Sequence, residues 1–177
     1  MRINFLNNKS GQTLIELIVA GAVILISFSA FLSMTIAVYS GAATSQDYVT
    51  ASNLAREGLE LVRNIRDTNW LAGNDFSVFT NGLADNTYKI DYLAGVLTTT
   101  TCSLNGYNSD CRLFVKDNFY SIDNTGTILT KYYRRIHFTQ VPETAAYLIK
   151  AVSVVSWQTK KGGEEEVELE VDFYDWY

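Results

Sequence analysis

Few side chains in this sequence could perform catalysis or bind a metal ion. The chain has 177 residues, with one histidine, His137, and two cysteines, Cys102 and Cys111. A hydrolytic triad would depend on His137, which has no evident partner in the sequence. A zinc site would need more ligands than this histidine can add. We therefore predict that the protein is not an enzyme and needs no cofactor.

The two cysteines enclose eight residues, which is not the C-x-x-C spacing of a redox motif. If this part of the chain is exported, Cys102 and Cys111 are expected to form a structural disulfide. Closing a loop of this size would contribute roughly 2–3 kcal/mol to stability by the chain-entropy model.

Two clusters of charged residues could bind ions or nucleic acid. The acidic cluster consists of Glu164, Glu165, Glu166, Glu168, Glu170 and Asp172. Carboxylates with strand spacing do not converge on one ion as in a looped calcium site, so we expect a solvated face. The second cluster, residues 131–135, mixes bases with aromatics, but on a strand Arg134 and Arg135 would point to opposite faces. With a net charge of −5, we do not expect binding to nucleic acid.

The apolar run from Leu17 to Tyr39 contains 23 residues without a charge, and Glu16 directly precedes it. As a helix this run would be roughly 35 Å long, at about 1.5 Å per residue. It could therefore cross the hydrocarbon core of a bilayer, which is about 30 Å thick. Because Arg2 and Lys9 precede the run, we expect a single pass through the cytoplasmic (inner) membrane, with the N-terminus in the cytoplasm and the rest outside.

The stretch KSGQTLIEL, residues 9–17, followed by this apolar run, resembles the leader and mature N-terminus of type IV pilins and pseudopilins. The resemblance implies that a prepilin peptidase cuts between Gly11 and Gln12 and methylates the new amine of Gln12. Glu16 would then be the fifth mature residue, where the family has its assembly glutamate. The family usually has Phe at the first mature position, so Gln12 points to a minor pilin.

A charge at Glu16 is costly in an apolar bundle, since a carboxylate at a bilayer centre costs on the order of 2.5–3.5 kcal/mol on insertion scales. Cleavage would create a cation, the amine of Gln12, whose pKa is ordinarily about 7.7–8.0. The two residues are neighbours at i and i+4 of one helix. Glu16 could equally pair with the amine of an adjacent subunit, or it could simply mark the interfacial end of a membrane anchor.

The segment from residue 41 to 68 has the pattern of an amphipathic helix. Its apolar residues fall in one arc, from Tyr48 to Ile65, and charged residues fall on the opposite side. We expect the i, i+4 ion pairs Arg56–Glu60 and Arg63–Asp67 on this side. Gly41, just after the apolar run, is the expected joint between the two helical halves.

The C-terminal part has strand signals. Residues 74–110 read as loops with one strand, Thr87–Leu93. A strand with alternating faces is expected over 128–139, whose apolar face has Ile128, Tyr132, Ile136 and Phe138 and whose solvated polar face has Lys131, Arg135 and His137. The stretch Tyr147–Trp157 is apolar on both faces, as a central strand would be, and 167–173 alternates strictly. The turn Lys160-Lys161-Gly162-Gly163 would join the last two in a hairpin.

These patterns predict an α+β fold, in which one long N-terminal helix packs under an antiparallel sheet, as the pilin resemblance also implies. The expected parts are a leader (1–11), a transmembrane and filament-core helix (12–40), an amphipathic half (41–68) and a β-rich head (69–177).

Three functions remain open from the sequence. The first is a structural or initiating subunit of a type IV pilus-like filament, and the second is a pseudopilin of a type II secretion system. The third is a membrane-anchored binding domain that does not polymerise. The expected partners of a pilin-like chain are the prepilin peptidase, other subunits, an inner-membrane assembly platform and membrane lipids. The assembled filament would be extracellular or periplasmic.

Overall fold

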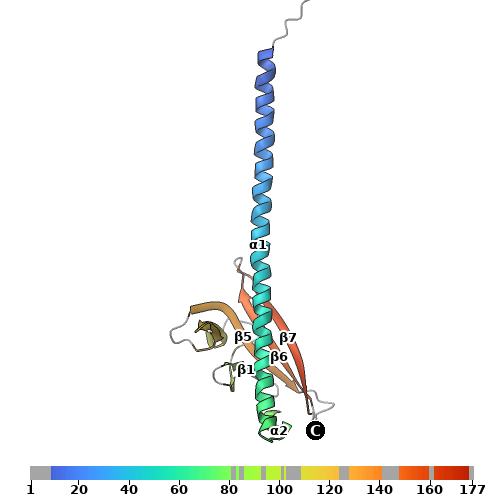
Figure 1. The fold of residues 1–177 in the computed structure, drawn as a ribbon, viewed down its shortest axis with the longest axis vertical. Coiled ribbons are helices and arrows are strands. Elements are labelled where there is room, and N and C mark those ends of the chain that lie inside the picture. Colours follow the sequence, from blue (N-terminus) through green and yellow to red (C-terminus); the bar gives the residue numbers. More distant parts are fainter. Residues whose placement is uncertain are drawn as a thin grey trace, which may run out of the picture. The chain divides into compact units, whose positions relative to one another are not determined.

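The computed structural model of the protein describes residues 9–80, 83, 86–92, 95–100, 102, 109–123, 128–140, 148–159 and 162–175. They belong to two compact units, of which the first ends at Gln46 and the second begins at Asp47. Most of the expected leader, residues 1–8, lies outside the described part. The predicted α+β class is confirmed, because a long N-terminal helix packs against an antiparallel sheet (Figure 1).

Helix α1 extends without interruption from Lys9 to Leu71 and passes through Gly41 as regular helix. It ends three residues later than the predicted residue 68. Gly73, with φ of 75°, terminates it in the left-handed conformation that glycine adopts without strain. The amide of Gly73 donates to Trp70 O at 2.9 Å and that of Asn74 donates to Asn69 O at 3.1 Å, which together make a Schellman motif.

Seven strands form one antiparallel sheet. They are β1 (Thr87–Ile90), β2 (Leu97–Thr99), β3 (Arg112–Lys116), β4 (Phe119–Ser121), β5 (Ile128–Gln140), β6 (Leu148–Gln158) and β7 (Glu164–Tyr174). Strand β5 pairs with β1, β3 and β6, while β6 lies between β5 and β7. Two short helices complete the described elements, α2 (Phe76–Thr80) and a 3-10 turn (Ser109–Cys111).

The long strands were predicted better than the short ones. Strand β6 is central, as expected, and β7 alternates between exposed and half-buried residues along most of its length. Gln158 is opposite Glu164, so β6 and β7 form the expected hairpin, and Gly162, just before β7, has φ of 80°. Lys160 and Lys161 lie outside the described residues. The strand predicted over residues 87–93 ends at Ile90, and neither β2 nor α2 was predicted.

The core lies between the C-terminal half of α1 and the sheet. The α1 stripe contributes Ala51, Leu54, Ala55, Leu59 and Val62, all buried. Facing them on the strands are the buried rings of Trp157, Phe138 and Phe173. At Gly58 the helix comes so near the sheet that a Cβ there would lie 2.8 Å from Ser153 Oγ. The predicted amphipathic stripe thus finds its cover in the sheet of the same chain.

One buried cation ties α1 to the sheet. The side chain of Arg134, on β5, is only 1% exposed and lies 3.1 Å from Glu57 of α1. It also donates to Leu54 O at 3.2 Å and to Ile90 O at 3.1 Å. These acceptors belong to α1 and β1, so one guanidinium holds three elements together.

A second polar contact between α1 and the sheet lies at Asp47. The hydroxyl of Tyr132 donates to Asp47 Oδ1 at 3.2 Å, and Lys131 forms an ion pair with the same carboxylate. Burial raises the pKa of Tyr132 to about 12. The phenol therefore stays protonated and keeps donating over the whole physiological pH range.

The predicted ion pairs of α1 are wrong. Glu60 pairs with Arg63 at i, i+3, and Asp67 pairs with the adjacent Arg66 at 2.7 Å. Arg66 also lies over the Phe173 ring, 5.3 Å from its centroid, which holds it at the sheet end of the helix. Arg56 remains exposed on α1.

Candidate functional site

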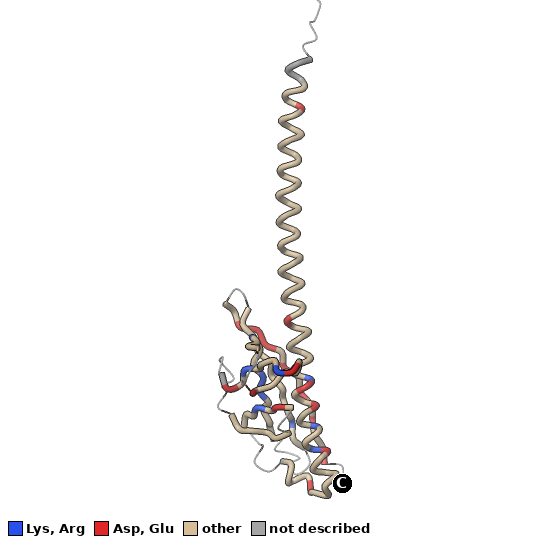
Figure 2. Tube along the Cα trace, turned by 60° about the vertical axis from the view of Figure 1, so that its left-hand side comes forward, with Lys and Arg blue, Asp and Glu red and all other residues tan. Residues whose placement is uncertain are grey.

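The N-terminal part of α1 is exposed on all sides. Its large apolar side chains, from Leu14 to Tyr39, are 46% to 75% exposed. In length and composition, α1 could cross a membrane. Figure 2 shows the trace of this half of α1 almost free of charged residues, whereas blue and red residues occur throughout the rest of the described chain.

Five hydroxyl groups in and just after this apolar stretch bond to their own helix. Ser27 donates to Val23 O at 2.8 Å, and Thr35 donates to Phe31 O at 2.9 Å. Ser33, Ser40 and Thr44 donate in the same way to carbonyls three or four residues earlier. These donors need no water, so the stretch is compatible with apolar surroundings on every side.

The residues of the expected cleavage motif lie in the first turns of α1. Gly11 and Gln12 are part of the helix, which begins at Lys9. Glu16 is one turn further along and exposed, and among the described residues it forms no ion pair. The helix therefore keeps the i, i+4 relation between residues 12 and 16 that the pairing hypothesis requires.

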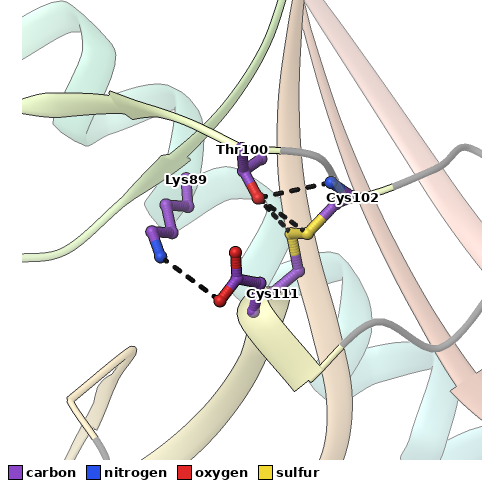
Figure 3. Close-up of polar contacts among 5 residues, drawn as sticks. Lys89, Thr100, Cys102 and Cys111 are labelled. Atoms are coloured by element: carbon purple, nitrogen blue, oxygen red, sulfur yellow. Dashed lines mark hydrogen bonds and ion pairs between the residues drawn. A yellow bond between two sulfur atoms is a disulfide. The ribbon is translucent and has the colours of Figure 1, made fainter.

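Cys102 and Cys111 form the disulfide that was expected (Figure 3). Both cysteines are buried and pack against Tyr133 of β5. Thr100 Oγ1 donates to Cys102 Sγ at 3.1 Å and accepts from the backbone amide of Cys102 at 3.3 Å. Next to it, Lys89 and Asp110 form an ion pair of 3.8 Å. The disulfide thus fastens the chain before β3 onto the sheet, which is a structural role.

The basic run of β5 does not form a surface patch. Arg134 points to α1 and Arg135 to the opposite face, as predicted, but both are buried. Arg135 pairs with Glu166 of β7 at 3.2 Å. The expectation that the Arg135 side chain lies on a solvated polar face is therefore wrong. Conversely, Ile128, which was assigned to the apolar face, is 72% exposed at the start of the strand.

The acidic face of β7 is exposed and partly neutralised. Besides Glu166, Glu170 pairs with Lys150 at 3.2 Å. No cluster of three or more His, Cys, Asp or Glu side chains that could hold a metal ion occurs in the part of the chain that the structure describes. His137 is half-buried on β5, which differs from the solvated position expected for it, and its Nδ1 atom is buried without a hydrogen-bond partner among the described residues.

A pocket of about 750 Å³ lies at the C-terminal end of α1, and we call it the α1-end pocket. It is lined by the last turns of α1, the α1–α2 connection, both phenylalanines of α2, and Tyr174 and Asp175 at the end of β7. Phe79 is buried there, stacked edge-on against Phe173 with ring centroids 5.9 Å apart. Trp70 and Tyr174 are 55% and 49% exposed. The pocket thus combines a packed aromatic base with two accessible rings.

Two backbone motifs fix the walls of this pocket. The Schellman motif at Gly73 sets the path of the chain out of α1. Asp75 then caps α2, because its Oδ1 accepts from the Ser77 amide at 2.8 Å. This hydrogen bond lowers the pKa of Asp75 below its ordinary value of 3.8, so the carboxylate is charged at neutral pH.

The sequence analysis missed the α1-end pocket. Its residues near 70 were read only as a helix end and a loop, and Tyr174 lies about one hundred positions away. The signal that could have marked it is the polar, aromatic stretch DTNWLAGNDF, residues 67–76, which encodes both a helix stop and a new helix start.

Comparisons of this chain with protein-family models, with curated proteins and with solved structures found no match.

Proposed function

We propose that this chain is a subunit, of the minor or initiating type, of a type IV pilus-like filament. It would be inserted in the inner membrane through α1, cut after Gly11 by a prepilin peptidase and methylated at Gln12. It would then polymerise through the N-terminal half of α1. The partners are other pilin-like subunits and the membrane assembly platform.

The observation that carries the proposal is the combination of features on one uninterrupted helix. The stretch that resembles a prepilin cleavage motif is followed by Glu16 and by an apolar stretch that is exposed on every side. The same helix then presents a narrow apolar stripe to a sheet. A helix exposed in this way needs an apolar partner from outside the chain, either lipid or further helices.

The mature N-terminus tests the proposal directly. Full-length chain is produced in cells with and without an active prepilin peptidase, and its intact mass is measured. With the peptidase, the expected mass corresponds to residues 12–177 plus one methyl group, and without it the chain keeps its leader. A chain that keeps residues 1–11 in peptidase-active cells contradicts the proposal.

A second measurement addresses assembly. The processed chain is expected in filaments sheared from the cell surface, together with other pilin-like subunits. A processed chain found only with a secretion complex would support a pseudopilin of a type II system instead. A chain found only as a monomer in the membrane would support a non-polymerising anchor.

A further inference from the structure

The base of the α1-end pocket is aromatic. Phe79 is buried there and lies against two further rings, with its centroid 5.8 Å from that of Phe76 and 5.9 Å from that of Phe173. Leu71 adds an aliphatic side chain to the lining. A concave site of about 750 Å³ with such a base suits a large apolar group, because hydrophobic and aromatic side chains form most of the lining of sites for such groups.

The walls of the pocket take part in more contacts than those with Phe79 and Phe173. Four lining residues, from α1, from α2 and from the end of β7, each have a further interaction: Arg66, Trp70, Phe76 and Asp175. Since these residues belong to separate walls, one group that reaches into the pocket would account for their interactions together.

The residue that follows the pocket wall in the sequence is a tryptophan. Tyr174 and Asp175 line the pocket, and Trp176 comes next, outside the described residues. Consecutive Cα atoms are about 3.8 Å apart, so the chain after Asp175 starts at the pocket itself. Tyr147, also outside the described residues, is less well placed, because its neighbour Leu148 is opposite Tyr174 but does not line the pocket.

An indole ring matches both the apolar and the polar parts of the lining. An aromatic side chain buries about 150–250 Å² and gains further from tilted or edge-on contacts with other rings, such as that of Phe76. A buried indole N–H needs an acceptor. The side-chain carbonyls of Asn69 and Asn74 lie in the lining, and Asn69 Oδ1 accepts from Asn74 Nδ2 at 3.4 Å, a bond in which Asn74 Oδ1 takes no part.

We propose that Trp176 occupies the α1-end pocket of its own chain and acts as a latch between the end of β7 and the end of α1. Among the described strands, β7 pairs only with β6, so its other edge has no partner strand. A ring seated in the pocket would hold this edge strand to α1 as well. The inference goes beyond the proposed filament and does not depend on it, because the contact lies within one chain.

Fluorine NMR tests the position of the indole. Full-length chain that contains 5-fluorotryptophan is prepared in detergent, and the signals of its three tryptophans are assigned with single Trp→Phe variants. A water-soluble gadolinium chelate broadens the signals of exposed rings. We expect the Trp176 signal to broaden several-fold less than that of free 5-fluorotryptophan and to resemble that of the buried Trp157. Broadening as strong as that of the free amino acid would overturn the proposal.

A charge in the wall tests whether this pocket is what protects the ring. Leu71→Asp, at the end of α1, is expected to increase the broadening of the Trp176 signal several-fold. Leu129→Asp is the matched control, at an exposed position of β5, and should leave it unchanged. Equal effects of the two substitutions, or none from Leu71→Asp, would overturn the proposal. Protection that is lost on dilution of the chain would also overturn it, since the ring would then lie in the pocket of a second copy.

Hydrogen exchange of α2 distinguishes the two candidate aromatic residues. Trp176→Ala is expected to speed the exchange of the amides of residues 76–80 several-fold, whereas Trp176→Phe, which keeps an aromatic ring, should have a smaller effect. Tyr147→Ala should leave these amides unchanged. Faster exchange in Tyr147→Ala with no change in Trp176→Ala would overturn the proposal and identify Tyr147 as the occupant.

Discussion

The two halves of α1 share one secondary structure but have opposite surroundings. From Leu14 to Tyr39 the large apolar residues are exposed around the whole helix, and among the described residues nothing covers them. From Ala51 to Val62 the apolar residues form one stripe, and the sheet buries it completely. The two halves therefore differ in where their apolar side chains are covered. The second half is covered within the chain, whereas the first half has no cover among the described residues, and the proposed function would supply it as lipid or other chains.

The largest expected effect comes from removing the cation that joins the second half of α1 to the sheet. Arg134→Ala leaves Glu57 and two backbone carbonyls without their donor, and we expect a loss of about 3–5 kcal/mol in the free energy of unfolding. Urea unfolding of the detergent-solubilised chain, followed by tryptophan fluorescence, measures this loss.

The matched control is Arg63→Ala, which removes an exposed helix pair and should cost only about 0.2–0.5 kcal/mol. Similar losses in the free energy of unfolding for the two arginine variants would show that the burial of Arg134 adds nothing to the stability of the protein.

The same truncation, Leu→Ala, is expected to have different effects in the two halves of α1. Leu54→Ala deletes buried methyl groups beneath the sheet and is expected to lower the free energy of unfolding by about 2–5 kcal/mol. Leu25→Ala removes the same atoms from the exposed half and should leave the unfolding of the head unchanged. A large effect of Leu25→Ala on the urea midpoint would mean that the first half also packs within the chain.

A change of charge in the first half should affect assembly and not folding. Glu16→Ala removes the carboxylate that is proposed to meet the amine of Gln12, while Gly11, the proposed cleavage residue, is kept. We expect normal processing but several-fold weaker incorporation into filaments, measured as the ratio of sheared to membrane-bound protein. Glu16→Gln, which keeps the size, should behave like the alanine variant, and normal incorporation of both would remove the pairing argument.

The smallest expected effect concerns the cap of α2. The folded-state pKa of Asp75 is lowered, so this residue contributes stability above its unfolded pKa, and the contribution is lost as the pH falls through the folded value. Asp75→Ala should therefore lower the melting temperature slightly at pH 7, and the difference from the unchanged chain should shrink as the pH falls below 3.8. If the difference in melting temperature grows as the pH falls, the Asp75 carboxylate does not stabilise α2 as its cap.

Sequence periodicity predicted α1 and the three long strands because each repeats its pattern over many residues. The five residues of α2 and the three of β2 are too short for a period to appear among the Asn, Thr and Gly that surround them. The same reasoning located the end of α1 to within three residues, since Gly73 is a strong stop signal.

Side-chain environments were harder to predict than elements. The burial of Arg135 depends on Ser156 and Glu166, which neighbouring strands bring to it, so its own strand pattern could not show it. The α1-end pocket joins residues near position 70 to Tyr174, and a sequence read in windows cannot place them together. The disulfide was predictable because only two cysteines are present.

The hydroxyls of Ser27, Ser33 and Thr35 donate to carbonyls of their own helix, which affects how α1 could move from lipid into contact with protein. These three hydroxyls are already satisfied, so they exchange no hydrogen bond when their apolar neighbours change from acyl chains to side chains. They can therefore pass repeatedly between lipid and protein without being left as unpaired polar groups in hydrocarbon.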